Sequence, residues 1–375
     1  MDLQESRARL DELDRQLVQL FEARMEICKD VADYKIATGK AVYDGEREKQ
    51  KLDAVGALAH GGYNETAIRE LFGQIMAISR RFQYGLMAEK GKGGGLGFMQ
   101  VESLPLEGVR VVYQGVEGAY GHGAVLQYFG QEADAYHVPT FEEAMQEVQE
   151  GRADYGVLPI ENSSAGAVID NYDLQVEYDN YIVAETFLPV SHALLGTPKA
   201  DLSGIRTVFS HPQALMQCSR FFHGQKHIRQ VSLENTAVAA KKVVEDGDPC
   251  QAAIASEIAG KLYGLKVLCP AIQNSQNNTT RFIILANRPI YRSDAAKVSI
   301  AFELPHRSGA LYNILGHFIF NGLNMRMIES RPIPGRSWEY RFFIDIEGNL
   351  KDAAIRNALK GCGAEASNMR ILGNY

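Results

Sequence analysis

The chain has 375 residues, 46% of them hydrophobic, and a formal net charge of −7 at pH 7. This length predicts two or three domains, each with its own core. Basic residues are interspersed with acidic ones, so we expect no nucleic-acid partner. No stretch approaches the roughly 20 apolar residues of a membrane span, and residues 1–10 lack the pattern of a signal peptide. We therefore expect a cytoplasmic protein without membrane contact, whose five cysteines are reduced thiols.

Residues 5–38 are predicted to form one long helix, because they contain no glycine or proline and their apolar residues recur every three or four positions. Two arginines, Arg7 and Arg24, lie on this apolar stripe. The other residues of the stripe are Leu10, Leu13, Leu17, Leu20, Ile27 and Val31. An unpaired guanidinium in a helical core is costly, so a carboxylate of the protein or an anionic ligand should meet both arginines.

Two further helices, one starting near Asp44, complete an expected all-α domain over residues 1–90. Three helices of which only one is long make a thin monomer, so an intertwined dimer is expected. The polar residues of interest in this domain are Arg7, Arg24, Lys35, Asp44, Arg47, Glu48, Ser79 and Gln83. This set suits an anionic small molecule, but carboxylates that meet the arginines across a dimer would explain it equally well.

A glycine-rich stretch within residues 91–104 is expected to be a flexible linker, because its glycines lose much chain entropy on ordering. From residue 105 to residue 290, short apolar runs such as 110–115 and 281–286 alternate with helical stretches such as 141–149. This alternation is typical of an α/β domain with a parallel sheet.

The α/β segment contains an internal similarity. Residues 111–125 and 207–218 each have the pattern of a strand, a polar turn and a helix start, and residues 154–166 and 251–260 form a second such pair. This duplication predicts two lobes that face each other across a cleft. Each lobe would direct helix N-termini, which favour anions, toward the cleft.

Three dense polar clusters, at residues 160–166, 210–218 and 278–282, lie at the ends of predicted strands. Single hydroxyls and amides at such positions often cap turns or helices, but three clusters together favour a binding site in the cleft. The sequence has no convincing Ser–His–Asp arrangement, phosphate-binding loop or metal-ligand spacing. We therefore expect no cofactor and no metal.

Residues 297–375 have the order β-α-β-β-α-β, which is typical of an α+β ferredoxin-like fold. Nothing in this segment indicates catalysis, and a sensor of small molecules is the better interpretation.

Residues 1–90 resemble the all-helical chorismate mutases, and every polar position of that active site has a match here. The resemblance implies that Lys35 and Gln83 are the catalytic contacts to the ether oxygen of chorismate. It implies that Arg24, and Arg7 reaching over from the other subunit, bind the two carboxylates. It also implies that Arg47 adds a further positive charge. Glu48 and the backbone at Asp44 would hold the ring hydroxyl, and Ser79 would support a carboxylate.

Residues 109–285 resemble prephenate dehydratases, which implies a two-lobed fold similar to periplasmic binding proteins. Thr280, within a Thr-Arg-Phe motif, matches the essential hydroxyl of that family. The implied substrate-binding residues are Asn162, Ser210, Gln217 and Arg281. One position departs from the family pattern, because the turn that usually reads Gly-Ser-Tyr-Ser ends in Gly121 here and lacks that hydroxyl.

The C-terminal segment resembles an ACT domain of the phenylalanine-binding kind. Two motifs carry the resemblance, Gly309-Ala310-Leu311 and Glu329-Ser330-Arg331-Pro332. Gly309 precedes a helix and would let backbone N–H groups approach an amino-acid carboxylate. In that family the ligand sits between two such domains.

Taken together, the chain resembles the bacterial P-proteins, which are bifunctional chorismate mutase–prephenate dehydratases with phenylalanine feedback. The implied partners are chorismate, prephenate and L-phenylalanine, in a homodimer or homotetramer. Two alternatives remain at this point. One is a mutase fused to an arogenate dehydratase, and the other is a non-catalytic amino-acid sensor.

Overall fold

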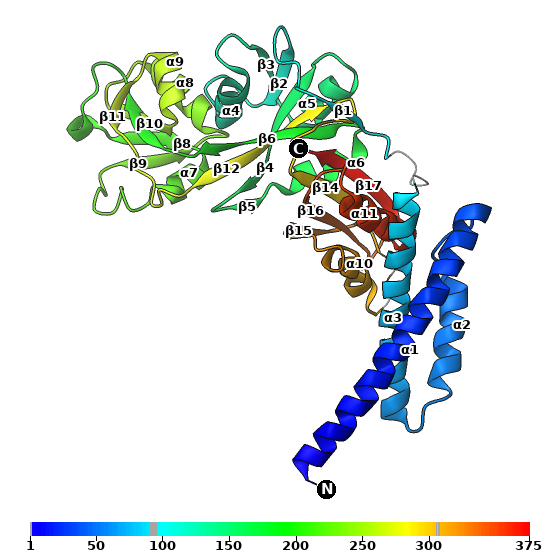
Figure 1. The fold of residues 1–375 in the computed structure, drawn as a ribbon. Helices are drawn as coiled ribbons and strands as arrows, with labels where there is room; N and C mark the ends of the chain where they lie inside the picture. Colours follow the sequence, from blue (N-terminus) through cyan, green and yellow to red (C-terminus); the bar gives the residue numbers. More distant parts are fainter. Residues whose placement is uncertain (1, 91–95, 305, 307) are drawn as a thin grey trace. The chain divides into compact units, whose positions relative to one another are not determined.

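The computed structural model describes residues 2–90, 96–304, 306 and 308–375 (Figure 1). These residues form two compact units. The first unit comprises Met1–Gly97 and Ala296–Ile371, and the second comprises Phe98–Ala295 and Leu372–Tyr375. The helical segment and the C-terminal segment, which we expected as separate domains, thus share the first unit. None of the helices in the described ranges is long and apolar enough to cross a membrane.

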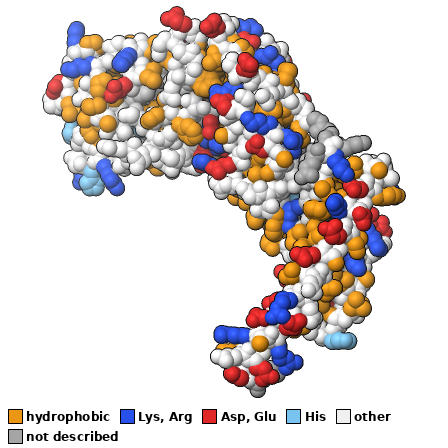
Figure 2. Space-filling view, viewed as in Figure 1, with side chains coloured by type: hydrophobic (Ala, Val, Ile, Leu, Met, Phe, Trp, Pro, Cys, Tyr) orange, Lys and Arg blue, Asp and Glu red, His pale blue; other side chains and the backbone are white. Residues whose placement is uncertain are grey.

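The surface carries both signs of charge. On the face seen in Figure 2, acidic and basic side chains are intermixed, as the sequence predicted.

Three helices begin the first unit: α1 (Leu3–Thr38), α2 (Gly45–Gly56) and α3 (Gly62–Glu89). Helix α1 ends at Gly39, whose φ of 71° is a left-handed conformation that favours glycine. Helix α2 begins at Asp44, whose side chain accepts a hydrogen bond of 3.0 Å from the backbone N–H of Arg47. Helix α3 packs against both α1 and α2. The sequence predicted only one long helix, but α3 has 28 residues.

The apolar stripe of α1 is exposed in a single chain. Leu10 is 58% exposed and Leu20 is 69% exposed, and Ala32 is the one buried residue among those described in α1. A row of large apolar side chains open to water is typical of a surface that another chain covers.

The rest of the first unit follows the order β-α-β-β-α-β, as expected. Its elements are β14 (Lys297–Glu303), α10 (Ala310–Ile319), β15 (Met325–Pro332), β16 (Tyr340–Glu347), α11 (Ala353–Glu365) and β17 (Ser367–Asn374). Strand β16 pairs antiparallel with both β14 and β15. Helix α3 packs against α10 and α11, so helices from the two ends of the chain lie side by side (Figure 1).

The second unit contains two large sheets, each covered by helices, and a two-stranded sheet of β1 and β13. Its strands are β1 (Met99–Val101), β2 (Arg110–Gln114), β3 (Asp134–Val138), β4 (Tyr155–Asn162), β5 (Gly166–Ala167), β6 (Tyr181–Pro189), β7 (Ala193–Gly196), β8 (Thr207–Ser210), β9 (Arg229–Ser232), β10 (Gln251–Ala255), β11 (Lys266–Cys269), β12 (Thr279–Ala286) and β13 (Ile290–Arg292). Its helices are α4 (Tyr120–Phe129), α5 (Phe141–Gln149), α6 (Ile169–Glu177), the short 3-10 helix η1 (Leu202–Gly204), α7 (Pro212–Gln217), α8 (Thr236–Asp246) and α9 (Glu257–Tyr263).

The two sheets correspond to the two lobes that the internal similarity predicted. Strands β6, β12, β4, β2 and β3 are neighbours in one sheet, and β11, β7, β10, β8 and β9 form the other. The paired repeats therefore fall in different sheets, with β2 and β4 in one and β8 and β10 in the other.

The sequence predicted a parallel sheet, and both large sheets contain parallel pairs, but each is mixed. The pairs β2–β3, β2–β4, β8–β9 and β8–β10 are parallel, but β12 is antiparallel to both β4 and β6. The reason is the path of the chain. Strand β6 leads from the first sheet to β7 in the second, and β12 leads back, so both cross between lobes rather than following a β-α-β connection.

Part of the predicted linker is ordered as sheet. Strand β1, within residues 91–104, pairs in parallel with β13. Residues 91–95 lie outside the described residues. At the other end of the chain, the C-terminal residues of the second unit join its sheet, because Gly373 pairs in parallel with Ile182 of β6.

Candidate active sites

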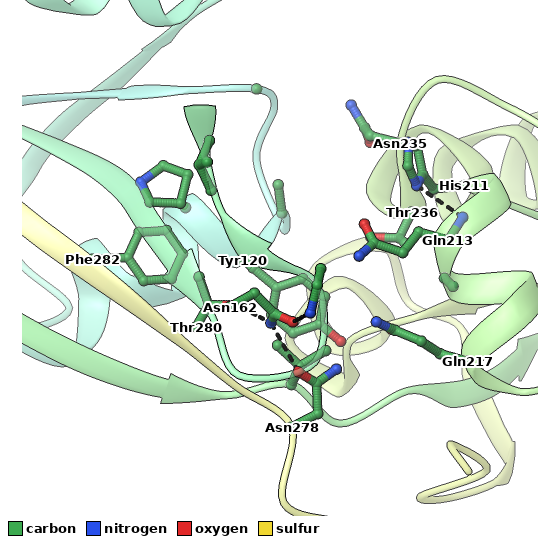
Figure 3. Close-up of a pocket in the computed structure, with 18 of the residues that line it drawn as sticks. Tyr120, Asn162, His211, Gln213, Gln217, Asn235, Thr236, Asn278, Thr280 and Phe282 are labelled. Carbon is green, nitrogen blue, oxygen red and sulfur yellow. Dashed lines mark hydrogen bonds between the residues drawn. The ribbon is translucent and has the colours of Figure 1, made fainter. Parts of the chain in front are cut away.

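A cavity of about 470 Å³ lies in the second unit and is lined by residues of both lobes. Asn162 and Thr280 come from the ends of β4 and β12 in the first lobe. His211 precedes α7 in the second lobe, and Gln217 is the last residue of that helix (Figure 3). All three polar clusters that the sequence singled out contribute residues to this lining.

The hydroxyl of Thr280 lies beside the amide of Asn162. These residues are direct partners in the β4–β12 pairing, and Asn162 Nδ2 donates to Thr280 Oγ1 over 2.9 Å and to Asn278 Oδ1 over 2.8 Å. The oxygen of the Asn162 side chain accepts from the backbone N–H groups of Ser164 and Ala165. Because the Thr280 oxygen accepts from Asn162, its own proton is left to donate to another group.

Helix N-termini reach the cavity from both lobes. Ala119, Val168 and Asn235, which precede α4, α6 and α8, all line it. Neither Ala119 nor Val168 caps its helix with a side chain, so the first N–H groups of α4 and α6 can bind an anion. No lysine or arginine occurs among the described residues of the lining. Backbone N–H groups are therefore the main source of positive potential for a carboxylate.

A chain of hydrogen-bonded side chains lines the cavity, with buried His192 between Tyr120 and Gln217. His192 Nε2 lies 2.9 Å from Gln217 Oε1, and His192 Nδ1 lies 2.9 Å from the hydroxyl of Tyr120. Burial lowers the pKa of His192 below its ordinary value, although the hydrogen bond to Gln217 opposes this shift. The hydroxyl of Tyr120 also lies 2.9 Å from the carbonyl oxygen of Ser191, which competes with His192 Nδ1 for its one proton. A neutral imidazole donates to Gln217 through Nε2 and leaves Nδ1 as the acceptor facing Tyr120.

Two predicted residues of this site are not brought into the lining. Ser210 is fully buried and its hydroxyl donates to the carbonyl of Ile254 over 2.7 Å, which ties β8 to β10. Arg281 lies on β12 between two lining residues, and so its side chain lies on the other face of the sheet. There it pairs with Glu185 at 2.7 Å. The structure gives Ser210 and Arg281 structural contacts.

Gly121, where the family pattern has a hydroxyl residue, does line the cavity. A Cβ atom added there would lie 3.1 Å from the carbonyl oxygen of Gln114, so a side chain would require a small shift of the backbone.

Sequence reasoning missed Tyr120 and His192 as lining residues, and it included Asn278 and Phe282 only as members of the polar cluster at 278–282. Asn278 and Phe282 each lie two residues from Thr280. Because alternate residues of a strand point to the same face, Phe282 is expected on the cavity side of β12, as Thr280 is. Tyr120 and His192 carry no local signal, since their contact joins α4 to the loop after β6.

In the first unit, most of the predicted mutase residues converge around α1, α2 and α3. One guanidinium nitrogen of Arg24 contacts the hydroxyl of Ser79 and lies 3.7 Å from the sulfur of Cys28. Among the described residues no carboxylate forms an ion pair with Arg24. Gln83 is buried and its Nε2 donates to the carbonyl of Ser79 over 3.2 Å. Within the described part of a single chain, Arg24 therefore lacks the negatively charged partner that the sequence predicted.

Lys35, near the end of α1, lies close to the segment that leads into α2. Its Nζ donates to the carbonyl of Val42 over 2.7 Å. Burial lowers the pKa of Lys35 below its ordinary value, while the nearby carboxylates of Asp44 and Glu48 oppose the shift. Glu48 in turn forms an ion pair with Arg80 of α3.

The remaining predicted mutase residues are exposed. Arg47 lies on the surface of α2, and Arg7 lies near the start of α1. Arg7 is 17 residues from Arg24, which in a helix corresponds to about 25 Å. These two arginines therefore cannot serve one site within a single chain.

The two predicted effector motifs lie on different elements of the C-terminal segment. Gly309 precedes α10 and has a φ of 78°, a left-handed conformation that favours glycine. Ala310 and Leu311 form the first turn of α10. The second motif, Glu329–Pro332, ends β15, which pairs only with β16 among the described strands.

Comparison with known proteins places both catalytic segments in families. Residues 6–84 match the family model of chorismate mutase type II, and residues 111–290 match that of prephenate dehydratase. The bifunctional chorismate mutase/prephenate dehydratase of Escherichia coli K12 is 34% identical over 375 residues, covering 98% of this chain and 95% of that protein.

Two solved structures resemble 71% of this chain with a TM-score of 0.66. One is a prephenate dehydratase from Arthrobacter aurescens in complex with L-Phe, 30% identical, of which 90% is covered. The other, 32% identical and 97% covered, is described as GqqA, a novel type of quorum-quenching acylase. Because one fold can host different chemistries, the full-length relative and the two family models decide the assignment. The chain belongs to the family of bifunctional chorismate mutase/prephenate dehydratases.

Proposed function

We propose that the two reactions of this family take place at the two groups of residues described above. Residues of α1, α2 and α3 rearrange chorismate to prephenate. The cavity of the second unit converts prephenate to phenylpyruvate. The observation that supports this most directly is the contact between Asn162 and Thr280, which leaves a threonine proton available in a cavity that can bind carboxylates.

The rearrangement of chorismate is a Claisen reaction, which needs no nucleophile and no proton transfer. The protein holds the compact pseudo-diaxial conformer and stabilises the negative charge that grows on the ether oxygen as the C–O bond breaks. Lys35 and Gln83 are the donors to that oxygen. Arg24, which has no carboxylate partner among the described residues, binds one carboxylate of the substrate, and Ser79 supports it.

The mutase site is completed by a second copy of the chain. Arg7 lies too far along α1 to reach Arg24 of the same chain, so it serves the site of a partner. The exposed apolar stripe of α1 becomes buried in the same dimer. Such a dimer would bury the apolar stripe of α1. It would also bring a second cation to a site that binds a dicarboxylate.

In the dehydratase step, prephenate loses carbon dioxide and its ring hydroxyl. The C–C bond to the ring carboxylate breaks, its electron pair completes the aromatic ring, and the C–O bond to the hydroxyl breaks at the far side. Thr280 donates its proton to the departing hydroxyl, which leaves as water, and solvent returns a proton to the threonine oxygen. A threonine hydroxyl is a weak acid, but the hydrogen bond from Asn162 stabilises charge on its oxygen. Backbone N–H groups at the starts of α4 and α6 orient the carboxylates.

L-phenylalanine is the feedback inhibitor in this proposal, and it binds the ACT-like C-terminal segment at Gly309–Leu311 and Glu329–Pro332. Two observations support this role. The Arthrobacter aurescens relative was solved with L-Phe, and Gly309 has the left-handed conformation at the start of α10. Coupling of this kind typically changes affinity by about 5- to 150-fold.

One coupled assay tests the proposed function. Chorismate absorbance and phenylpyruvate formation are followed with and without L-phenylalanine, and arogenate is supplied in a parallel reaction. We expect loss of chorismate, formation of phenylpyruvate and slower turnover with L-phenylalanine. Turnover of arogenate in place of prephenate would identify the alternative dehydratase, and a protein that binds L-phenylalanine without turning over either substrate would be a sensor.

A further inference from the structure

An ion-pair network joins the mutase helices to the C-terminal segment within the first unit. Arg80 of α3 is 6% exposed and lies between two carboxylates. One terminal nitrogen, Nη1, donates to Glu48 Oε1 on α2 over 2.6 Å, and the other, Nη2, lies 2.9 Å from Glu365 Oε1 on α11. A single guanidinium therefore spans a predicted substrate contact and a residue near the C-terminus.

The far end of this network is buried and tightly packed. The side chain of Glu365 is 3% exposed, and its Oε1 also lies 2.8 Å from Nε2 of His317 on α10. Burial disfavours the charged form of Glu365, but contacts with His317 and Arg80 hold its pKa below the ordinary value. The ring of His317 is buried and packs directly on Gly361, where a Cβ atom would lie 2.2 Å from the ring.

Neighbouring contacts fix α3 on the same surface. Arg81 lies with its guanidinium 3.4 Å from the ring centre of Phe320. Asn357 of α11 donates to the carbonyl of Arg81 over 3.4 Å and to Asn321 Oδ1 over 2.8 Å. The position of Arg80 is thus set by α10 and α11 as well as by its own helix.

The position of Glu48 depends on this network. Both oxygens of Glu48 contact Nη1 of Arg80, so the orientation of the carboxylate follows the guanidinium. Without the charge of Glu365, the buried guanidinium would have one carboxylate rather than two, and Glu48 would be drawn further toward it. A carboxylate drawn toward Arg80 is less available to the ring hydroxyl of chorismate.

We propose that Arg80 is a positioning residue of the mutase site, held in place by Glu365 and His317 of the C-terminal segment. The inference rests on the proposed role of Glu48 in binding chorismate. In this arrangement α10 and α11 contribute to mutase activity without touching the substrate, and the dehydratase cavity is not involved.

The test compares Glu365→Gln with Glu347→Gln in the full-length chain. The first substitution keeps the shape of the side chain and removes its charge. Glu347 is the matched control, since it forms an exposed ion pair with Arg326 in the same segment. We expect Glu365→Gln to raise the mutase KM for chorismate at least about fivefold, with dehydratase kinetics on prephenate unchanged and Glu347→Gln like the wild type.

A double-mutant cycle separates positioning from a general loss of structure. In a Glu48→Gln background, Glu365→Gln should have little further effect on KM, because the route through Glu48 is already lost. Additive effects, or a Glu365→Gln variant with wild-type KM, would overturn the inference. If Glu365→Gln does not fold, Arg80→Lys takes its place in the cycle, since one ammonium cannot donate to both carboxylates through two separate nitrogens.

The wild-type enzyme distinguishes this inference from the function on which it rests. A wild-type chain without mutase turnover would contradict the proposed function itself. A normal wild-type turnover with an unaffected Glu365→Gln variant would contradict only the positioning role.

Discussion

The side-chain amide of Asn162 donates a hydrogen bond to the hydroxyl oxygen of Thr280 over 2.9 Å. This contact orients the threonine, because an oxygen that accepts from an amide points its own proton elsewhere. The same asparagine holds the turn after β4 through its oxygen, which accepts from Ser164 and Ala165. The two functions of one side chain can be separated by substitution.

Asn162→Asp is expected to abolish most dehydratase activity while leaving the turn intact. An aspartate still accepts from the two backbone N–H groups, but it no longer donates to Thr280. The threonine would then donate to the carboxylate and not to the substrate. We expect a loss of about 10²–10⁴-fold in kcat, the usual contribution of acid–base catalysis, measured as phenylpyruvate formed from prephenate. Unchanged mutase turnover is the control, and a kcat near that of the wild type would contradict the role of Asn162.

Thr280→Ala should remove dehydratase turnover, and Thr280→Ser should restore a large part of it. The alanine removes the donor, whereas serine keeps a hydroxyl beside Asn162. Both variants are assayed for phenylpyruvate and for chorismate consumption. If Thr280→Ala forms phenylpyruvate at the normal rate, another group assists the departing hydroxyl.

Lys35→Ala should show the reverse pattern. Removing one donor that is fixed before the reaction usually costs about 10²–10³ in rate, so chorismate consumption should nearly stop. Dehydratase turnover of added prephenate should continue, because Lys35 belongs to the other unit. A Lys35→Ala protein with wild-type mutase kcat would show that the ether oxygen has other partners.

The sequence predicted the parts of this protein that depend on local patterns. The long α1 follows from the spacing of its leucines, and the N-terminus of α2 follows from Asp44, whose side chain caps it. Asn162, Thr280 and Gln217 lie within the polar clusters at predicted strand ends, and the resemblance to prephenate dehydratases singled them out within those clusters. All of these signals are contained in stretches of a few residues.

Contacts set by tertiary packing were not predictable in the same way. Arg281 is adjacent to Thr280, and its charge favoured a carboxylate partner, but the alternation of β12 places it against Glu185 on the other face. Ser210 was expected to contact the substrate, but its hydroxyl donates to the carbonyl of Ile254. Ile254 lies on β10, which is next to β8 in the sheet but 44 residues away in the chain. Arg80 gave no signal, since its partners lie on α2 and α11.

His192 is a residue of the cavity that sequence reasoning missed, and it should make the stability of the protein depend on pH. Burial lowers the pKa of His192 in the folded protein, whereas an unfolded histidine titrates near pH 6.5. As the pH falls below about 6.5, the unfolded state therefore takes up more protons than the folded state, and the free energy of unfolding decreases. The stabilising effect of a neutral His192 is fully present above pH 6.5 and is lost toward the lower pKa of the folded state.

His192→Gln isolates this contribution, because glutamine does not titrate. Thermal unfolding of the wild type, His192→Gln and the exposed control His223→Gln is compared between about pH 7.5 and pH 5.5, one unit either side of the unfolded pKa. Burial also lowers the pKa of His122, but His122 is present in all three proteins and cancels in the comparison. We expect the Tm of His192→Gln to fall less steeply with acid than that of the wild type, even though its Tm at neutral pH is lower through loss of the Tyr120 contact. If Tm changed equally with pH in all three proteins, His192 would be protonated as readily in the folded chain as in the unfolded one. That result would contradict a neutral imidazole between Tyr120 and Gln217.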